Sequence, residues 1–178
     1  MNIFVLDNDI ETCAQSMFDS HVSKMVLETA QLLSAAVREL FPEQVPDNAY
    51  RVTHVNHPCT VWARKTVANF MWLRELGLAI AAEYTYRYGK VHASEAVIRA
   101  MPYIETEDVI TPQPKAVADE YKNVFGVVNA YRQYYISKLK DLSPSKTMFT
   151  KRAPPGWLYP YYEYNDSKDK FVVIAPFV

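Results

Sequence analysis

The chain has 178 residues, of which 49% are hydrophobic and 22% charged, and this composition excludes disorder and allows a sizeable core. Four glycines against thirteen tyrosines argue against a sheet protein with many tight turns, and two cysteines are too few for a disulfide framework. The start MNIFVLDND lacks a basic signal-peptide region, and no apolar run of membrane-spanning length occurs. We therefore expect one cytoplasmic domain over residues 1–178, in the host cytoplasm if the protein is viral, without membrane contact.

The net charge of −1 is unevenly distributed along the chain. Residues 1–50 carry two bases against eight acids, residues 51–99 seven bases against three acids, and residues 138–152 five bases against one acid. The two basic segments predict a nucleic acid or nucleotide as partner, although the near-neutral total disfavours strong non-specific binding to DNA. Ordinary solvated helix faces are the alternative interpretation.

The amino-terminal half predicts two long helices. Apolar side chains recur at helical spacing from Asp9 or Thr12 to about Leu40, after which two prolines enforce a loop. A second apolar stripe begins at Pro58, which suits the first turn of a helix, and ends at Gly89, which suits a helix carboxyl end.

The carboxyl-terminal half predicts a short helix over residues 93–100, a proline-punctuated acidic loop over residues 102–118 and a helix over residues 119–140. The apolar segments 2–6 and 171–178 suit short strands or extended buried segments. We therefore expect an all-α fold of about four principal helices, with a possible minor strand pair from the two termini.

His21, Lys24 and Glu28 project from one face of the first predicted helix, because they lie three or four and seven residues apart. The same stretch is otherwise apolar, and a buried charge is unfavourable unless it is paired. These three residues therefore predict a polar active site. The alternative is a surface pair of Lys24 and Glu28, which would stabilise the helix by a few tenths of a kcal/mol.

Arginine and aromatic residues interleave at the end of the second predicted helix. This pattern suits stacking on bases and contact with phosphates, although tyrosine rings that pack in the core would give the same pattern. Arg64, near the start of that helix, would contact a different part of a ligand. The candidate binding residues at the helix end are Tyr84, Arg87, Tyr88, Lys90 and His92.

The loop before the second helix contains H-x-x-H-P-C, from His54 through His57 to Cys59. A zinc site needs three or four ligands in defined geometry, and this loop lacks the paired CxxC or HExxH spacing. The sequence also lacks GxGxxG, P-loop and GxSxG motifs. We therefore expect no metal and no cofactor, and we keep a metal-dependent hydrolase using His54, His57 and His92 as a weaker alternative.

The order of these features resembles the phage endonuclease V type of pyrimidine-dimer DNA glycosylase. Three features carry the resemblance: His21 followed seven residues later by Glu28; the Asn56-His57-Pro58 loop; and DEYKNVFGVVNAYRQYYISKLK followed by the aromatic segment Trp157 to Tyr162. With Met1, His21 and Glu28 as catalytic candidates, the substrate-binding candidates are then Lys24, Asn56, His57, Arg64, Trp157 and the helix-end residues above.

The resemblance implies a helical fold in which a short amino-terminal segment threads between helices. It also implies that the amino-terminal α-amine attacks C1′ of a target nucleotide, that Glu28 stabilises the cationic sugar, and that β-elimination can follow. An α-amine with an ordinary pKa of ~7.7–8.0 supplies more neutral nucleophile at pH ~7 than a lysine with a pKa of ~10.4. The target nucleotide must first leave the base stack.

Two departures from the family pattern affect this reading. Phage members expose a small residue after methionine removal, whereas Asn2 is too large for ordinary removal, so Met1 itself would carry the amine. Phage members also place arginines around the glutamate, whereas Lys24 is the only base near Glu28 in the sequence. A free or signalling nucleotide would need less phosphate-binding surface than duplex DNA. The competing hypothesis is a non-catalytic phage accessory protein that binds a host protein, nucleic acid or nucleotide through a tyrosine-rich surface.

Overall fold

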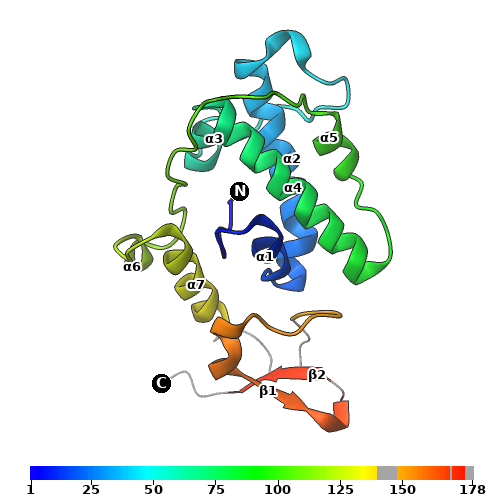
Figure 1. The fold of residues 1–178 in the computed structure, drawn as a ribbon, viewed down its shortest axis with the longest axis vertical. Coiled ribbons are helices and arrows are strands. Elements are labelled where there is room, and N and C mark those ends of the chain that lie inside the picture. The colour runs from blue at the N-terminus through cyan, green and yellow to red at the C-terminus, as the bar shows by residue number, and fades with distance from the viewer. Residues whose placement is uncertain (140–147, 169, 175–178) are drawn as a thin grey trace.

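Two long helices, α2 (Asp19–Leu40) and α4 (Val67–Tyr88), pack against each other at the centre of the molecule (Figure 1). The computed structural model describes residues 1–139, 148–168 and 170–174. Most of the apolar positions predicted from the sequence face inward on both helices, with side chains such as Leu32, Leu33, Leu76 and Ile80 buried. The prediction of a mainly helical fold is confirmed.

Each long predicted helix is divided in two, and a side-chain cap stands at the division in the second but not in the first. The first becomes α1 (Ile10–Gln15) and α2, with Asp9 accepting a hydrogen bond from the Thr12 N–H at the start of α1. The second becomes α3 (Pro58–Ala63) and α4, and the Thr66 side chain caps α4 by accepting from the Asn69 N–H. Side-chain oxygens at these positions satisfy amides that a helix start leaves unpaired.

The remaining helices are short and lie at the periphery. α5 (Glu95–Ala100) follows the predicted boundaries closely. The helix predicted over residues 119–140 is divided into α6 (Asp119–Lys122) and α7 (Val127–Lys138), because Gly126 has a φ of 78° and interrupts the helical backbone. Residues 102–118 form no helix or strand and connect α5 to α6. In the described part of the chain, no helix is both long and apolar enough to span a bilayer.

The amino-terminal segment is extended and enters the core without pairing as a strand. Its residues Ile3 to Leu6 are at most 6% exposed. Side chains satisfy part of its backbone: the Arg132 guanidinium donates to the Leu6 carbonyl, and the Leu6 N–H donates to the Cys13 sulfur. In Figure 1 the segment lies between α4 and α7, with the first residue near α3.

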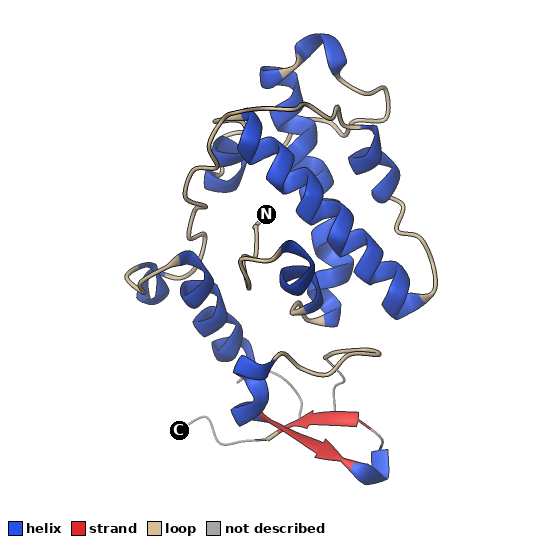
Figure 2. Cartoon of the chain, in the orientation of Figure 1, coloured by secondary structure: helices blue, strands red, loops and turns tan. Residues whose placement is uncertain are grey.

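The strand pair forms from the tail alone, and the prediction that both termini contribute to it was wrong. β1 (Tyr162–Asn165) pairs antiparallel with β2 (Lys170–Val173), with Tyr162 opposite Val173 (Figure 2). The 3₁₀ helices η3 (Gly156–Tyr161) and η4 (Asp166–Lys168) flank β1, and η1 (Pro42–Gln44) follows α2. Close sequence separation makes this hairpin easy to form, whereas the amino-terminal segment satisfies its backbone elsewhere.

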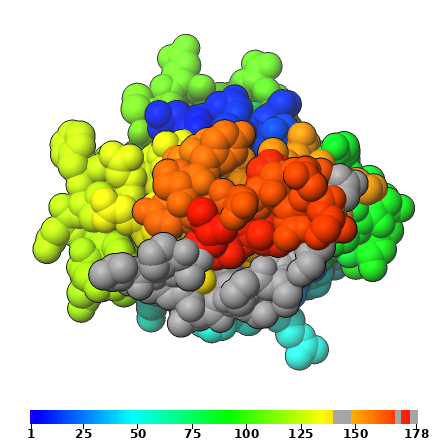
Figure 3. Space-filling view, turned by 90° about the horizontal axis from the view of Figure 1, so that it is seen from below, coloured from blue at the N-terminus to red at the C-terminus, as the bar shows by residue number. Residues whose placement is uncertain are grey.

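Viewed from below, the tail lies across the middle of one face of the molecule (Figure 3). Leu158 and Tyr162 from this segment join the buried core. Lys140, Asp141 and Lys146 of the predicted basic segment, and residues 175–178 of the predicted strand, lie outside the described residues.

The contact between α2 and α4 depends on the missing side chain of Gly77. A Cβ at Gly77 would lie 2.7 Å from the Thr29 methyl carbon. We expect Gly77→Ala to lower the free energy of unfolding by about 1–3 kcal/mol, because overpacking outweighs the helix propensity that alanine adds. Urea unfolding measures the effect. In a Thr29→Ser background, which removes that methyl group, Gly77→Ala should lower the free energy of unfolding by less. An equal loss in both backgrounds would contradict the packing argument.

Candidate active site

The carboxylate of Glu28 lies beside the start of the chain. Glu28 is on the third turn of α2, on its buried face, and is 8% exposed. Its Oε2 accepts a hydrogen bond of 2.9 Å from the Asn2 backbone N–H and lies 4.0 Å from the Met1 amine nitrogen. Its Oε1 lies 3.3 Å from the Lys24 ammonium. One nearly buried carboxylate therefore faces two amines.

Met1 is anchored by its side chain and exposed by its main chain. The side chain is 4% exposed and packs against the core, whereas the residue as a whole is half-buried. The exposed surface of Met1 therefore belongs to main-chain atoms, which include the amine. The partly exposed main chain of the first residue therefore lies beside the Glu28 carboxylate.

His57 borders the same site from the start of α3. Its Nδ1 accepts from the Cys59 N–H at 3.2 Å and so caps the helix. Burial lowers the pKa of His57, and the positive charges of the N-terminal ammonium and His54 lower it further. The preceding Asn56 is exposed. The structure thus brings the Asn56-His57-Pro58 loop to the amine, where the ring of His57 favours its neutral form.

His21 supports the amino-terminal segment and lies away from Glu28. Its Nδ1 and the Tyr135 hydroxyl oxygen are 2.6 Å apart, and its ring stacks on Phe4 with centroids 4.5 Å apart. Burial lowers the pKa of His21 to about 4, with further lowering by Lys138 and Lys24. Two helical turns separate His21 from Glu28, which is about 10 Å along the axis. His21 thus fixes Phe4 and, through it, the chain that leads to Met1.

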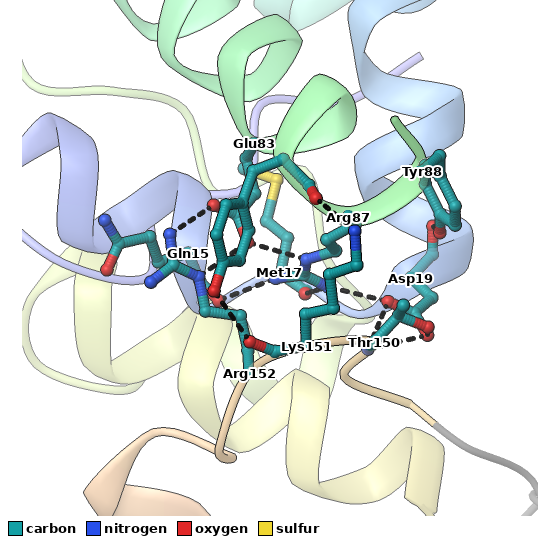
Figure 4. Close-up of polar contacts among 10 residues, drawn as sticks. Gln15, Met17, Asp19, Glu83, Arg87, Tyr88, Thr150, Lys151 and Arg152 are labelled. Carbon is teal, nitrogen blue, oxygen red and sulfur yellow. Dashed lines mark hydrogen bonds and ion pairs between the residues drawn. The ribbon is translucent and has the colours of Figure 1, made fainter. Parts of the chain in front are cut away.

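Arg87 at the end of α4 lies inside a closed network of charges (Figure 4). It is 2% exposed, and its guanidinium lies 2.6 Å from a Glu83 oxygen and 2.9 Å from an Asp19 oxygen. It also donates to the carbonyl oxygens of Gln15 and Met17. Because each guanidinium nitrogen bonds to the protein and the side chain is fully buried, Arg87 is not exposed to a ligand.

The same network holds the tail against the helices. Arg152 pairs with Glu83 through contacts of 3.0 and 2.8 Å, and the Thr150 N–H and hydroxyl donate to Asp19. Burial, the largest single influence, raises the pKa of Glu83, but hydrogen bonds and positive charge from Arg152 and Arg87 together bring it below its ordinary value. The cluster is a structural clamp between α4, the start of α2 and residues 150–152.

The other predicted binding residues are dispersed. The Tyr88 hydroxyl donates to the Asp19 carbonyl, and the buried Tyr84 ring contacts His92 edge-on with centroids 4.8 Å apart. Lys90 is exposed on a shallow hollow that Tyr84 and Tyr88 also line. Arg64 pairs with Glu39 at 3.0 Å. This end of α4 meets α2 at Asp19, about 13 Å along the helix from Glu28, so the structure does not bring it to the amine.

Two further observations concern the aromatic tail and metal binding. Trp157 is half-buried, with the Arg132 guanidinium 5.4 Å from its ring centroid. Among the described residues, no three His, Cys, Asp or Glu side chains are placed to hold a metal ion. Cys59 is buried, which raises the pKa of its thiol to about 12, and so is Cys13, with a pKa of about 11.

A comparison with known protein families finds a match over the amino-terminal half of the chain. A family model described as pyrimidine dimer DNA glycosylase matches residues 1–95, just over half of the 178-residue chain. The chain belongs to this family. No curated protein and no solved structure matches it significantly. Membership in this glycosylase family makes DNA its partner, and the matched part contains Met1, Glu28 and His57.

This glycosylase-family chain completes the site with residues outside the matched part. The Tyr131 hydroxyl on α7 and the backbone at Ala116 both contact the Asn2 side chain. Sequence patterns do not predict this contact, because Tyr131 belongs to the apolar stripe of its helix and Asn2 to no recognisable motif. Their contact joins positions more than a hundred residues apart, which local patterns do not encode.

The Arg87 clamp predicts a large loss of stability on mutation. We expect Arg87→Met to lower the free energy of unfolding by about 3–5 kcal/mol, because Glu83 and Asp19 would keep buried charges without their main partner. The matched change Lys90→Met, three residues further along and exposed, should stay within about 0.5 kcal/mol. Urea unfolding at neutral pH measures both, and similar values for the two variants would contradict the clamp.

Buried His21 predicts that acid destabilises the protein. Its pKa falls from 6.5 to about 4 on folding, so between these values only the unfolded state takes up the proton. The stability is complete above pH ~6.5 and falls by up to about 1.4 kcal/mol per pH unit as acid is added. Urea unfolding of the wild type and of His21→Gln at pH ~7.5 and pH ~5 tests this. Between these two pH values, His21→Gln should lose less free energy of unfolding than the wild type. Equal losses would exclude His21 as the cause of the acid destabilisation.

Proposed function

We propose that this protein is a DNA glycosylase with lyase activity, in which the Met1 amine is the nucleophile and Glu28 assists it. The observation that carries the proposal is the 4.0 Å separation between the Met1 amine and the nearly buried Glu28 carboxylate. The family description supports a pyrimidine dimer in DNA as the substrate, and another damaged or modified base would undergo the same chemistry.

The proposed reaction begins with attack of the neutral amine on C1′ of the target nucleotide. The bond from C1′ to the base breaks, and the base leaves with the bonding electrons and gains a proton. The attached nitrogen loses a proton, and the sugar ring then opens as the C1′–O4′ bond breaks and O4′ takes up a proton. Loss of the second nitrogen proton leaves an imine between Met1 and C1′. Removal of a C2′ proton expels the 3′ phosphate by β-elimination, and water releases the amine.

Glu28 suits the steps that create positive charge. A carboxylate near an oxocarbenium-like sugar stabilises it, as in glycoside hydrolysis. The hydrogen bond from the Asn2 N–H fixes Oε2 on the side of the amine. The 4.0 Å separation from the Met1 nitrogen exceeds direct hydrogen-bond length, so the amine is not tied to the carboxylate. A reacting carbon can therefore approach while Glu28 stays within reach of the transferred protons.

Lys24 is the competing nucleophile. Its ammonium lies 3.3 Å from Glu28, and its side chain is 67% exposed, so a substrate can reach it as well. Lysines have an ordinary pKa of ~10.4, against ~7.7–8.0 for α-amines, so the α-amine class supplies far more neutral nucleophile near pH ~7. We assign Lys24 the role of pairing with Glu28 and with a DNA phosphate, and Met1 the role of nucleophile.

Borohydride trapping tests the assignment. Wild-type protein would be reduced in the presence of duplexes that contain a cyclobutane pyrimidine dimer, an abasic site, other modified bases or no damage. We expect a covalent adduct with damaged DNA that mass spectrometry maps to residue 1. Glu28→Gln should lower turnover by about 10²–10⁴-fold, because it removes the carboxylate that transfers protons.

Two controls separate the candidate amines. Lys24→Ala should keep the adduct on residue 1, whereas a chain extended before Met1 by a Gly-Ser pair should lose it. An adduct on Lys24 would overturn the choice of nucleophile. Absence of any adduct with every DNA would overturn the enzyme proposal and favour the accessory binding protein considered above.

A further inference from the structure

The side chain of Asn2 is held by contacts from three parts of the chain. Its Nδ2 donates to the Ala116 carbonyl at 2.9 Å, and its Oδ1 accepts from the Ile3 N–H at 2.8 Å. The same oxygen accepts from the Tyr131 hydroxyl at 2.7 Å. The backbone N–H of Asn2 meanwhile donates to Glu28. One residue thus joins the first peptide unit to the carboxylate, to α7 and to the connection that precedes α6.

Tyr131 is held in place by the protein core. Its side chain is fully buried, and its ring packs edge-on against Phe4 with centroids 5.8 Å apart. Its hydroxyl accepts from the Ala116 N–H at 3.2 Å and lies 3.0 Å from the Pro114 carbonyl. Burial raises the pKa of the Tyr131 hydroxyl, which therefore stays protonated and able to donate. Tyr131 and residues 114–116 form a rigid socket for the Asn2 side chain.

A reactive group at the end of a chain must be held in a defined position by surrounding residues. Terminal residues are usually poorly ordered unless they are tied down. A misplacement of about 1 Å at a reacting group can reduce a rate by about 10²-fold. The Met1 amine is attached directly to the peptide unit whose N–H belongs to Asn2. Fixing both the N–H and the side chain of Asn2 therefore restricts the directions from which the amine can meet Glu28 and a bound sugar.

We propose that Asn2 is a positioning residue that, held by Tyr131 and the backbone of residues 114–116, orients the Met1 amine against Glu28. This rests on the proposed function and adds residues to it. The polar atoms of the Asn2 side chain are directed at protein groups, so Asn2 acts through the amine rather than on the substrate. The socket is supplied by residues beyond 95, outside the part of the chain that the family model matches.

Two variants test the inference. Tyr131→Phe removes the hydroxyl and keeps the ring, and Asn2→Leu removes the side-chain amide while leaving residue 2 too large for methionine removal. Asn2→Ala is unsuitable, because a small residue would permit that removal and move the amine. Tyr50→Phe is the matched control, since it loses a comparable hydroxyl contact of 3.0 Å, to Ser94 near α5.

The measurement is the single-turnover rate of borohydride trapping on abasic-site duplex at saturating protein, with the dissociation constant and the melting temperature determined in parallel. We expect Tyr131→Phe and Asn2→Leu each to trap about 10- to 100-fold more slowly, with DNA affinity within about threefold of wild type. The double variant should be little slower than the slower single variant, because both changes break one contact. Tyr50→Phe should trap at the wild-type rate even if its melting temperature falls.

Trapping at the wild-type rate by Asn2→Leu would overturn the inference. Asn2→Leu tests the inference even if Tyr131→Phe folds poorly, because Asn2→Leu leaves Tyr131 unchanged. A loss of rate matched by an equal loss of DNA affinity would also overturn it. Failure of the proposed function is a different result: wild-type protein would then give no adduct on residue 1.

Discussion

The burial of the amino-terminal segment is the constraint on which the rest of the structure depends. Residues 3–6 enter the core as extended chain, and their backbone is satisfied by side chains such as Arg132 and Cys13. Once these residues are buried, the position of the first residue is no longer free. Its methionine side chain packs inward and its amine comes within 4.0 Å of Glu28. The packing of apolar side chains thereby determines where the candidate nucleophile lies.

Two clusters of charge include residues of α2, and they serve different purposes. The cluster around Arg87 is closed: its guanidinium is fully buried, each of its nitrogens bonds to the protein, and Arg152 and Thr150 connect the tail to it. The cluster around Glu28 is open, since the Lys24 side chain is 67% exposed and the main chain of Met1 faces outward. A network whose charges all satisfy one another supports the fold, whereas a carboxylate beside accessible amines is available for chemistry.

Helix periodicity predicted the helical class and the inward faces of α2 and α4, because burial of an apolar stripe is a local and repeated signal. It did not predict the interruptions near Ser16, Arg64 and Gly126. The Thr66 side chain caps the helix that begins after Arg64, and Gly126 has a positive φ. The strand pair was assigned to both termini because both are apolar. Pairing depends on which backbone groups remain unsatisfied after packing, and sequence composition does not report this.

By itself, the sequence determined the helical fold, the spacing that brings Lys24 and Glu28 together, and the family to which the first 95 residues belong. Only the tertiary structure decided that Arg87 is a buried clamp rather than an exposed cation, and that His21 supports Phe4 rather than Glu28. It alone joined Asn2 to Tyr131. The reason is physical: helix faces follow from neighbours three and four residues apart, whereas the availability of a charge depends on partners that folding brings from distant parts of the chain.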